Sequence, residues 1–580
     1  MAYTMTRKPK SNYWEPSAQA KANEVIFGVL REFTVYATSK FNNTCSATGT
    51  KISRGDPIAM YVDDNGDKKY TVWPIPASVR EPRTPFANFI PDKYKIELRD
   101  TLRNSTQHIS VLARAGSGKT KGFCWAITEE LKNLGKVAAI AFGVRDSIEM
   151  KRILPDAVYK STSHSFCFTA LKKKYPKLKF NGDKLDQLIE ETVGEGNELY
   201  HVRNLVEEIV AKCKCDAVTD KNRKAILQTI ESYAITVKEG LLEEVVDYVQ
   251  IVLKKSLNVT KYGLDFDDQI WLAAVTDVTF DFYDVICVDE VQDFSYAQLL
   301  IIEKLIKQGS RILAVGDDNQ AMYEFRGARH DAFERIRNLL ENDKRGMKAI
   351  SMPICYRCSI EVLKDAQTIV PDIEPRPDAP LGSVTYGHDV EEMMESVGAG
   401  DAIICRTNRP VIKIAHKLLE ANREFALLGG EVEATLICKI IYYLTWNSGK
   451  GECPAAELAL MIKDWIEVKT AMTTNANLLE LYQGRADVIA MFAEHCKTAD
   501  DVMRQVRRVF MANDFEDKIM LGTFHRVKGA EANTVWIIPT DLKRVPQPKT
   551  PSEVQQERNA LYVSKTRAKL NTRYVAKPVE

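Results

Sequence analysis

The sequence has almost no net charge and no long apolar run. Its 80 Lys and Arg residues are balanced by 79 Asp and Glu residues, which leaves a formal net charge of +1 at pH 7. A surface that binds a polyanion would therefore have to be a local patch. No apolar run comes near the 18 residues of a membrane-spanning helix, and the first residues do not form a secretion signal. We therefore expect a soluble, intracellular protein without a membrane partner.

The 12 cysteines form neither a disulfide framework nor a complete metal site. Two pairs are close in sequence, Cys213 with Cys215 and Cys355 with Cys358, but a structural zinc site takes four ligands and the chain has no second C-x-x-C pair. Residues 40–49 resemble a small zinc finger, except that a threonine stands where its second cysteine would be. The sequence therefore predicts reduced thiols, and a finger-like segment that lacks its metal or is a chance likeness.

With 580 residues, the chain is long enough for several domains. From residue 85 onward, short apolar runs are each followed by a polar turn and a helical stretch, as in parallel α/β sheets. Two such sheets are expected, each interrupted by a helical insertion. Before residue 85, alternating β-branched and aromatic residues predict a small antiparallel β unit over Thr34–Ile75. The runs expected to be parallel strands are Ile109–Leu112, Val137–Phe142, Val285–Val288, Arg311–Val315 and Ala402–Cys405.

The stretch His108–Gly122 combines an apolar strand, a glycine-rich turn and the start of a helix. Gly116 and Gly118 let backbone N–H groups point inward, and the helix N-terminus adds partial positive charge at the same point. Lys119 can then reach the outer phosphates of a nucleotide, while the Thr120 hydroxyl ligates magnesium. An alanine replaces the usual first glycine of this pattern. The stretch predicts a phosphate loop for ATP and Mg²⁺.

A second stretch, Phe282–Phe294, places two carboxylates at the end of an apolar strand, where an open α/β sheet binds its ligands. Asp289 is predicted to hold magnesium, and Glu290 to orient and deprotonate the attacking water. A lone Asp-Glu pair after a strand is a weak signal. The pair lies about 170 residues after the phosphate loop, and together the two motifs are a strong signal of a nucleotide-hydrolysing site.

A third stretch, Leu313–Ala328, begins with a strand and continues into a polar turn. Gln320 in this turn is placed to sense the terminal phosphate. Tyr323 and Phe325 offer flat faces on which bases can stack, a contact that tolerates any base sequence. Aromatic residues at this spacing are equally often buried core, so the residues alone leave both interpretations open.

In order and spacing, these three stretches resemble motifs I, II and III of the superfamily 1A helicases of the UvrD/Rep type, and the likeness covers about residues 85–570. It implies an α/β fold with two RecA-like P-loop domains, helical insertions and a small N-terminal β-rich module. The divisions expected are an N-terminal accessory module at 1–84, RecA-like domain 1A at 85–169 and 259–345, helical insertion 1B at 170–258, RecA-like domain 2A at 346–435 and 509–580, and helical insertion 2B at 436–508.

The resemblance also implies a role for each matching residue. The catalytic residues would be Lys119, Asp289, Glu290, Gln320, Arg357 and Arg567. The nucleotide would be bound by Ala115, Gly116, Ser117, Gly118, Lys119, Thr120, Lys121, Tyr356, which stacks on adenine, and Glu531, which contacts the ribose. Magnesium would be held by Thr120 and Asp289. Nucleic acid would be contacted by Phe142, Thr162, His164, Tyr323, Phe325, Arg406 and His525.

The chain departs from the family at the position that reads the base. The family usually has a glutamine that recognises adenine ahead of the phosphate loop, and the matching position here is Tyr94. Adenine specificity is therefore either relaxed or supplied by other residues. The family's usual tryptophan is replaced by Phe325, which retains a ring for stacking.

The activity implied is that of an ATP-dependent DNA helicase that moves 3′ to 5′ on single-stranded DNA in replication, recombination or repair. The implied partners are single-stranded and tailed duplex DNA, together with a single-strand-binding protein or another replication partner, and the implied state on DNA is a monomer. The expected location is the cytoplasm of a bacterium or virus-infected host cell, in association with the nucleoid.

Two alternatives stay open from the sequence. One is a subunit of an ATP-dependent helicase-nuclease, although no carboxylate cluster with a nearby lysine stands out in the first 84 residues or the C-terminal tail. The other is a nucleic-acid-binding protein with a motor fold and little unwinding. The intact Lys119, Asp289, Glu290 and Arg567 favour an enzyme over this second alternative.

Overall fold

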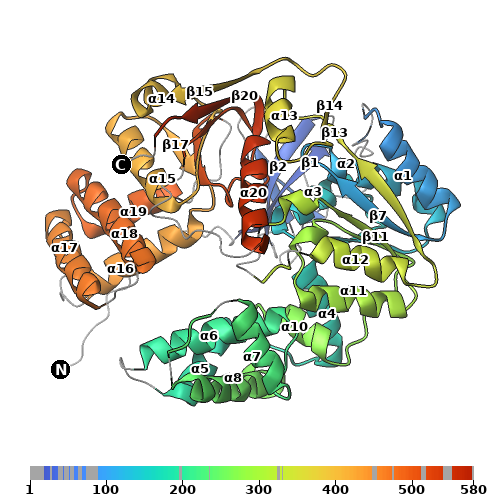
Figure 1. Cartoon of the computed structure of the whole chain (residues 1–580), viewed down its shortest axis with the longest axis horizontal. Helices are drawn as coiled ribbons and strands as arrows, with labels where there is room; N and C mark the ends of the chain where they lie inside the picture. The colour runs from blue at the N-terminus through green and yellow to red at the C-terminus, as the bar shows by residue number, and fades with distance from the viewer. Residues whose placement is uncertain are drawn as a thin grey trace. The chain divides into compact units, whose positions relative to one another are not determined.

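The computed structural model describes most of the chain from residue 89 onward (Figure 1). Before that point it describes six strands and Phe86. The described remainder is 89–577 apart from 195–198, 234, 239, 323–326, 330, 447–452, 473–475, 511–516 and 540–550. The chain divides into two compact units, Met1–Ile90 and Pro91–Glu580, and each is described by itself.

The first unit contains an antiparallel sheet of four strands in the order β1-β2-β5-β6. Its strands are β1 Ala18–Ile26, β2 Val29–Tyr36, β5 Ile58–Val62 and β6 Lys68–Val72. A short antiparallel pair is formed by β3 Asn43–Thr44 and β4 Lys51–Ile52. The sheet starts earlier than the alternating pattern indicated. Apart from β3, the finger-like segment at 40–49 lies outside the described residues.

A parallel six-stranded sheet in the order β12-β7-β11-β10-β8-β9 organises the first half of the second unit. Its strands are β7 His108–Ala113, β8 Val137–Ala141, β9 Tyr159–Thr162, β10 Val285–Val288, β11 Arg311–Gly316 and β12 Met347–Met352. Its helices are α1 Lys93–Asn104, α2 Lys119–Glu130, α3 Val144–Ile153, α4 Ser163–Lys174, α10 Asp268–Val275, α11 Tyr296–Lys307 and α12 Ala332–Glu341. We call this half the first lobe.

The first lobe ends later than the sequence indicated. The expected division fell before residue 346, but β12 follows it and pairs with β7 along its whole length. The hydrogen bonds of this parallel ladder place Met347–Met352 in the first sheet. The four strands predicted for this lobe are otherwise present within one residue at each end.

A helical insertion interrupts the first lobe and packs on α4 and α10 through a continuous apolar core. We call it the first insertion, and its helices are α5 Lys184–Val193, α6 Tyr200–Cys215, α7 Arg223–Ser232, α8 Leu242–Ser256 and α9 Val259–Tyr262. A buried ion network fastens it to the lobe. The Nζ atoms of Lys184 and Lys214 lie 2.5 and 2.9 Å from the Asp268 carboxylate, and Lys214 also lies 2.7 Å from Asp265.

The Asp268→Asn change is expected to lower the free energy of unfolding by about 3 kcal/mol, because breaking a buried ion network leaves uncompensated charge inside the protein. Chemical denaturation measures this loss. The matched control is Asp281→Asn, which breaks an exposed pair with Lys173 and should cost less than about 1 kcal/mol. Equal losses in the two variants would contradict a stabilising role for the network.

The second parallel six-stranded sheet has the order β15-β20-β19-β16-β18-β17. Its strands are β15 Ser383–His388, β16 Ala402–Cys405, β17 Phe425–Leu427, β18 Ile519–Thr523, β19 Ala532–Ile537 and β20 Ala568–Val575. Around it lie α13 Ile360–Gln367, α14 Val390–Ser396, α15 Asn408–Glu420 and α20 Pro551–Lys565, and a short pair formed by β13 Ile354–Cys355 and β14 Glu374–Pro375. We call this half the second lobe.

A second insertion of four helices interrupts the second lobe and has its own apolar core. Its helices are α16 Glu431–Trp446, α17 Ala455–Met472, α18 Ala476–His495 and α19 Ala499–Phe510. Among the described residues, no helix has the length and apolar character needed to cross a membrane. In the same part of the chain, no cluster of three or more potential metal ligands is present.

Candidate active site

The glycine-rich turn lies between β7 and α2, at the carboxyl edge of the first sheet. Gly116 and Gly118 both have a φ of +70°, a left-handed conformation that favours glycine. The Ser117 hydroxyl is buried and, within the described residues, has no hydrogen-bond partner. An orphaned buried donor beside a helix N-terminus fits an anion. The turn therefore has the geometry of a phosphate cradle.

Four predicted residues meet at this cradle. The Thr120 hydroxyl donates to Asp289 Oδ2 at 2.9 Å, and Lys119 forms an ion pair with Glu290. Burial raises the pKa of Asp289 to about 7, although Lys119 acts against this shift. For Glu290 the effect of burial is outweighed by Lys119 and Lys528, which hold its pKa well below the usual range. The hydroxyl and carboxylate oxygens are the hard ligands that Mg²⁺ prefers.

Glu290 is held in a strained backbone conformation. Its φ of +55° and ψ of +39° lie in the left-handed region, which for a residue other than glycine costs of order 1–3 kcal/mol. Its backbone N–H donates to Asp289 Oδ1 at 2.9 Å, and the Gln292 amide donates to its carboxylate. Strain that is fixed by neighbouring hydrogen bonds indicates that the orientation of this carboxylate matters to function.

Gln320 is connected to Glu290 through a chain of hydrogen bonds inside the first lobe. Its Nε2 donates to Asp317 Oδ2 at 2.7 Å. The backbone N–H of Asp317 donates to Gln292 Oε1 at 3.1 Å, and Gln292 in turn bonds to Glu290. The predicted phosphate sensor is therefore buried, with its amide bonded to Asp317, and it is linked to the Glu290 carboxylate through Asp317 and Gln292.

Lys528 crosses from the second lobe to the same carboxylates, and sequence reasoning gave it no role. It forms an ion pair with Asp293, lies 3.5 Å from Glu290 Oε2 and donates to the Gln320 carbonyl at 3.2 Å. Burial raises the pKa of Asp293 to about 6, against the pull of Lys528. The available signal was its place in the segment GTFHRVKGAE, next to the predicted His525 and Glu531.

Arg114 and Tyr562 are two further contacts between the lobes that the sequence did not indicate. Arg114, in the glycine-rich turn, lies 2.9 Å from Asp317 and 2.8 Å from Asp372, the latter in the second lobe. The Tyr562 hydroxyl on α20 accepts the N–H of Ala115 at 3.1 Å. Both contacts join the turn directly to the second lobe. A movement of one lobe relative to the other would therefore change the geometry of the phosphate cradle.

The segment around Tyr356 is placed against the turn from the second lobe. The Tyr356 N–H donates to the Gly116 carbonyl at 2.8 Å. A Cβ added to Gly116 would come within 2.9 Å of the Arg357 Cβ, so only glycine allows this approach. The guanidinium of Arg357 donates to Glu531 Oε1 at 2.7 Å. Glu531, predicted to contact ribose, is therefore also a partner of a predicted catalytic arginine.

Arg567 is buried in the second lobe, with 3% of its surface exposed. Its donors go to neutral oxygens: the Val563 carbonyl at 2.8 Å, the Thr566 hydroxyl at 3.2 Å and the Ala530 carbonyl at 3.4 Å. Burial and the nearby Arg357 lower its pKa to about 9. A buried cation that bonds only neutral oxygens among the described residues is suited to receive an anion.

The residues predicted to contact nucleic acid are spread over both lobes. His164 stacks on Phe266 with ring centroids 4.0 Å apart, and burial lowers the His164 pKa to about 4, so the ring is neutral. Phe266 is 56% exposed and was not predicted as a contact. Phe142 is partly buried and stacks on Phe294 at 6.5 Å.

The other predicted contacts differ in their surroundings. Thr162 caps α4, where its hydroxyl accepts the Ser165 N–H. Arg406 forms an ion pair with Glu557 of α20, and His525 is partly buried in the turn after β18. Tyr323 and Phe325 lie outside the described residues.

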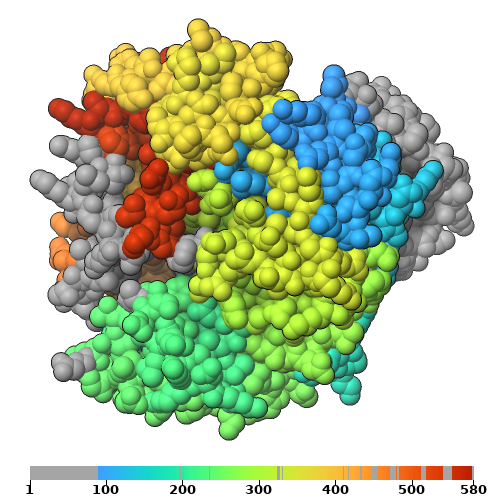
Figure 2. All heavy atoms as spheres, turned by 45° about the vertical axis from the view of Figure 1, so that its right-hand side comes forward, coloured from blue at the N-terminus to red at the C-terminus, as the bar shows by residue number. Residues whose placement is uncertain are grey.

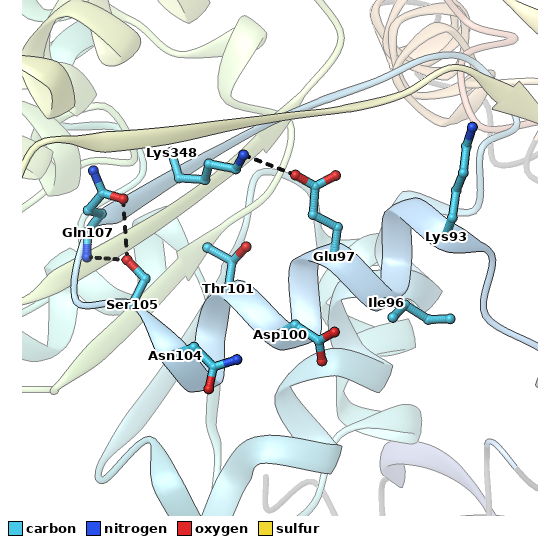
Figure 3. A pocket seen from close by; sticks show the side chains of 9 residues that line it. All are labelled: Lys93, Ile96, Glu97, Asp100, Thr101, Asn104, Ser105, Gln107 and Lys348. Carbon is cyan, nitrogen blue, oxygen red and sulfur yellow. Dashed lines mark hydrogen bonds and ion pairs between the residues drawn. The ribbon is translucent and has the colours of Figure 1, made fainter.

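A shallow groove of about 560 Å³ lies away from the cradle, on the outer face of α1. Figure 3 shows the lining of this groove, with Lys93, Glu97 and Asp100 projecting from α1 and an ion pair between Glu97 and Lys348 of β12. Figure 2 shows α1, in blue, at the surface of the molecule. None of the groove's lining residues belongs to the predicted site.

Comparison with known proteins gives two family matches. The family described as UvrD/REP helicase N-terminal domain matches residues 95–341, and the UvrD-like helicase C-terminal domain matches residues 457–572. Together they cover more than half of the chain. The chain belongs to the UvrD/Rep helicase family. The first match contains the cradle, Asp289, Glu290 and Gln320, and the second contains Glu531 and Arg567. The two parallel sheets are thus the two RecA-like domains of a UvrD/Rep protein.

Curated members of the UvrD/Rep family are distant in sequence. The chain is 24% identical over 391 residues to the ATP-dependent DNA helicase PcrA of Bacillus subtilis, a match covering 57% of this chain and 50% of PcrA. It is 27% identical over 286 residues to the ATP-dependent DNA helicase Rep of Escherichia coli, covering 45% of this chain and 40% of Rep. The chain thus spans half the length of these relatives or less.

Proposed function

We propose that the chain is an ATP-dependent DNA helicase that moves 3′ to 5′ on single-stranded DNA. The observation that carries this proposal is the meeting of Lys119, Thr120, Asp289 and Glu290 at a phosphate cradle, with Lys528 of the second lobe reaching the same carboxylates. The curated relatives PcrA and Rep are named ATP-dependent DNA helicases, which supports DNA as the substrate and ATP as the nucleotide that is hydrolysed.

The residues present fit Mg-ATP. The unpartnered Ser117 hydroxyl and the N-terminus of α2 supply donors for phosphate oxygens, while Thr120 and Asp289 supply oxygens for magnesium. Bound magnesium would neutralise charge on the outer phosphates. Glu290 would orient the attacking water and accept its proton, once Lys119 has turned from Glu290 to the phosphates.

The contacts between lobes supply the coupling that a motor needs. Lys528, Arg114 and Tyr562 join the cradle to the second lobe, and Arg357 packs directly against Gly116. When the nucleotide at the cradle changes, these contacts would change and the two lobes would move relative to each other. This movement would alternately tighten and loosen the hold of each lobe on the DNA strand. Gln320 and Arg567 complete the proposed catalytic set as phosphate sensor and as the arginine that stabilises transition-state charge.

Single-stranded DNA is proposed to cross both lobes through Phe142, Thr162, His164, Arg406 and His525. The stacked pair of His164 and Phe266 supports this, because an exposed ring gives bases a face to stack on. The proposal also includes tailed duplex DNA and a single-strand-binding protein or other replication partner. It includes action as a monomer in the cytoplasm of a bacterium or virus-infected host cell, in association with the nucleoid.

The test is nucleotide turnover with and without single-stranded DNA, followed by unwinding of duplexes with a 3′ or a 5′ tail. We expect turnover to rise at least about tenfold with DNA, in line with the gating of such cycles by conformational steps. Unwinding is expected from the 3′ tail. Turnover indifferent to DNA, or unwinding from the 5′ tail, would overturn the proposal. DNA-stimulated turnover without unwinding would limit the proposed activity to translocation on single-stranded DNA.

A further inference from the structure

A cluster of three side chains borders the phosphate cradle, to which it is joined through the backbone of Tyr356. The ammonium of Lys95 lies 4.4 Å from the centre of the Tyr356 ring. Asp92 forms an ion pair with Lys95 and accepts the Tyr356 hydroxyl at 2.8 Å. Tyr356 itself is bonded through its backbone N–H to the Gly116 carbonyl. The cluster thus links α1, the cradle and the second lobe.

Lys95 is fixed by packing as well as by charge. Its side chain, 3% exposed, runs over the first turn of α2, so that a Cβ added to Gly122 would meet its Cε, Cδ and Cγ at 3.1 to 3.3 Å. A cation held under an aromatic ring is attracted by the ring's electron-rich face. Tyr356, of which 36% is exposed as a residue, is therefore a platform held in place by Asp92 and Lys95, and its exposed surface is open to a base.

Asp92 has no capacity left to read a base. Its Oδ1 accepts the backbone N–H groups of Tyr94 and Lys95 at 3.0 and 2.9 Å, and its Oδ2 accepts Lys95 Nζ and the Tyr356 hydroxyl. A carboxylate offers about four acceptor sites, and all four are used. Burial would raise the pKa of Asp92, but these hydrogen bonds outweigh it and lower the pKa, so the group stays ionised.

The cluster therefore has no free acceptor for a base, and the Lys95 ammonium is not an accessible donor, because it is bonded to Asp92 and buried against the Tyr356 ring. The exocyclic amine of adenine needs an acceptor, which a glutamine side chain would supply and this cluster does not. The 6-oxo group of guanine needs a donor, which the buried Lys95 does not supply either. Stacking on Tyr356 is insensitive to which purine is present.

We infer that this site binds purine nucleoside triphosphates without discriminating adenine from guanine, with Tyr356 as the stacking platform and Asp92 and Lys95 as its positioning residues. The inference rests on the proposed function, since it takes the cradle to hold the triphosphate. It differs from strict ATP use, because a site that hydrogen-bonds a distinguishing group rejects the analogue by about 10⁴-fold or more.

The experiment measures binding of ATP, GTP and CTP to the Glu290→Gln protein, and turnover of the same nucleotides by wild type. We expect ATP and GTP to bind within about tenfold of each other and more tightly than CTP, because the larger purine ring stacks better. Tyr356→Leu should remove the preference for purines. Lys95→Met keeps the stem over Gly122 and should weaken both purines equally, by about threefold to tenfold.

The matched control is Lys93→Met, which removes a cation from the face of α1 that lines the groove (Figure 3), a face to which Lys95 does not contribute, and it should change nothing. A preference for ATP over GTP beyond tenfold would overturn the inference and leave the proposed function standing. Equal purine binding without DNA-stimulated turnover would support the inference and overturn the proposed function. Failure of all three nucleotides to bind would overturn both.

Discussion

Glu290→Gln is expected to lower DNA-stimulated ATP turnover by about a thousandfold, within the range of 10² to 10⁴ attributed to a positioned general base. This corresponds to about 4 kcal/mol of transition-state stabilisation. The amide retains the shape of the carboxylate but cannot accept a proton from water. It also loses the ion pair with Lys119, which leaves that lysine available to the phosphates. Nucleotide affinity should therefore be unchanged or higher.

Steady-state turnover and direct nucleotide binding on the same preparation separate these two effects. Glu303→Gln is the matched control, because it breaks an exposed pair with Lys307 on α11 far from the cradle and should leave turnover unaltered. Turnover of the Glu290 variant within tenfold of wild type would show that another group activates the water. Asp293 would then be the next candidate for the general base, since its carboxylate forms an ion pair with Lys528, which also lies near Glu290.

The parts of the site that sequence predicted are those encoded by contiguous residues. A buried apolar run followed by glycines, Lys119 and Thr120 specifies a strand, a turn and a helix N-terminus within a few residues. The same holds for Asp289 and Glu290 after β10. The predicted strands β7, β8, β10, β11 and β16 are present for the same reason, since each apolar run is long enough only for a strand buried on both faces.

The parts that sequence missed depend on contacts between distant segments. Lys528 meets Asp293 across 235 residues, and Ala115 meets Tyr562 across 447. No local pattern encodes such pairs, because they form only when two sheets have folded and docked. The same reason explains why β12 was missed. Its alternating polar residues do not resemble a buried parallel strand, and its place in the sheet is set by pairing with β7.

Departures from a motif can also be resolved only in three dimensions. Tyr94 stands where the family has a glutamine, but the residues that surround the candidate base platform are Asp92 and Lys95, on either side of it in sequence. The first turn of α1 thus supplies the polar groups next to Tyr356, whereas the phosphate cradle is formed by the turn between β7 and α2. Our inference on base recognition therefore leaves phosphate binding at the cradle unchanged.

Arg567→Met is expected to reduce turnover by about 10³ to 10⁵, the range for an arginine that stabilises charge on a transferring phosphoryl group. The same change should alter the free energy of unfolding by less than about 1 kcal/mol. Arg567 is buried and bonds only neutral oxygens among the described residues, one at 2.8 Å and two beyond 3.1 Å. Replacing such a buried charge by an apolar side chain of similar volume is often neutral or stabilising.

Arg311 provides the matched control, because it is equally buried but lies on the first lobe. Its three donors reach the Thr101, Leu102 and Gln107 carbonyls at 3.0, 2.9 and 2.7 Å, and the first two of these carbonyls lie in the last turn of α1. Arg311→Met should therefore cost about 2 kcal/mol of stability while the folded protein keeps its turnover. Thermal or chemical unfolding measured beside turnover distinguishes the two arginines. If Arg567→Met instead lost stability and kept turnover, Arg567 would be a structural residue, and Arg357 beside Gly116 would be the arginine that acts on the phosphate.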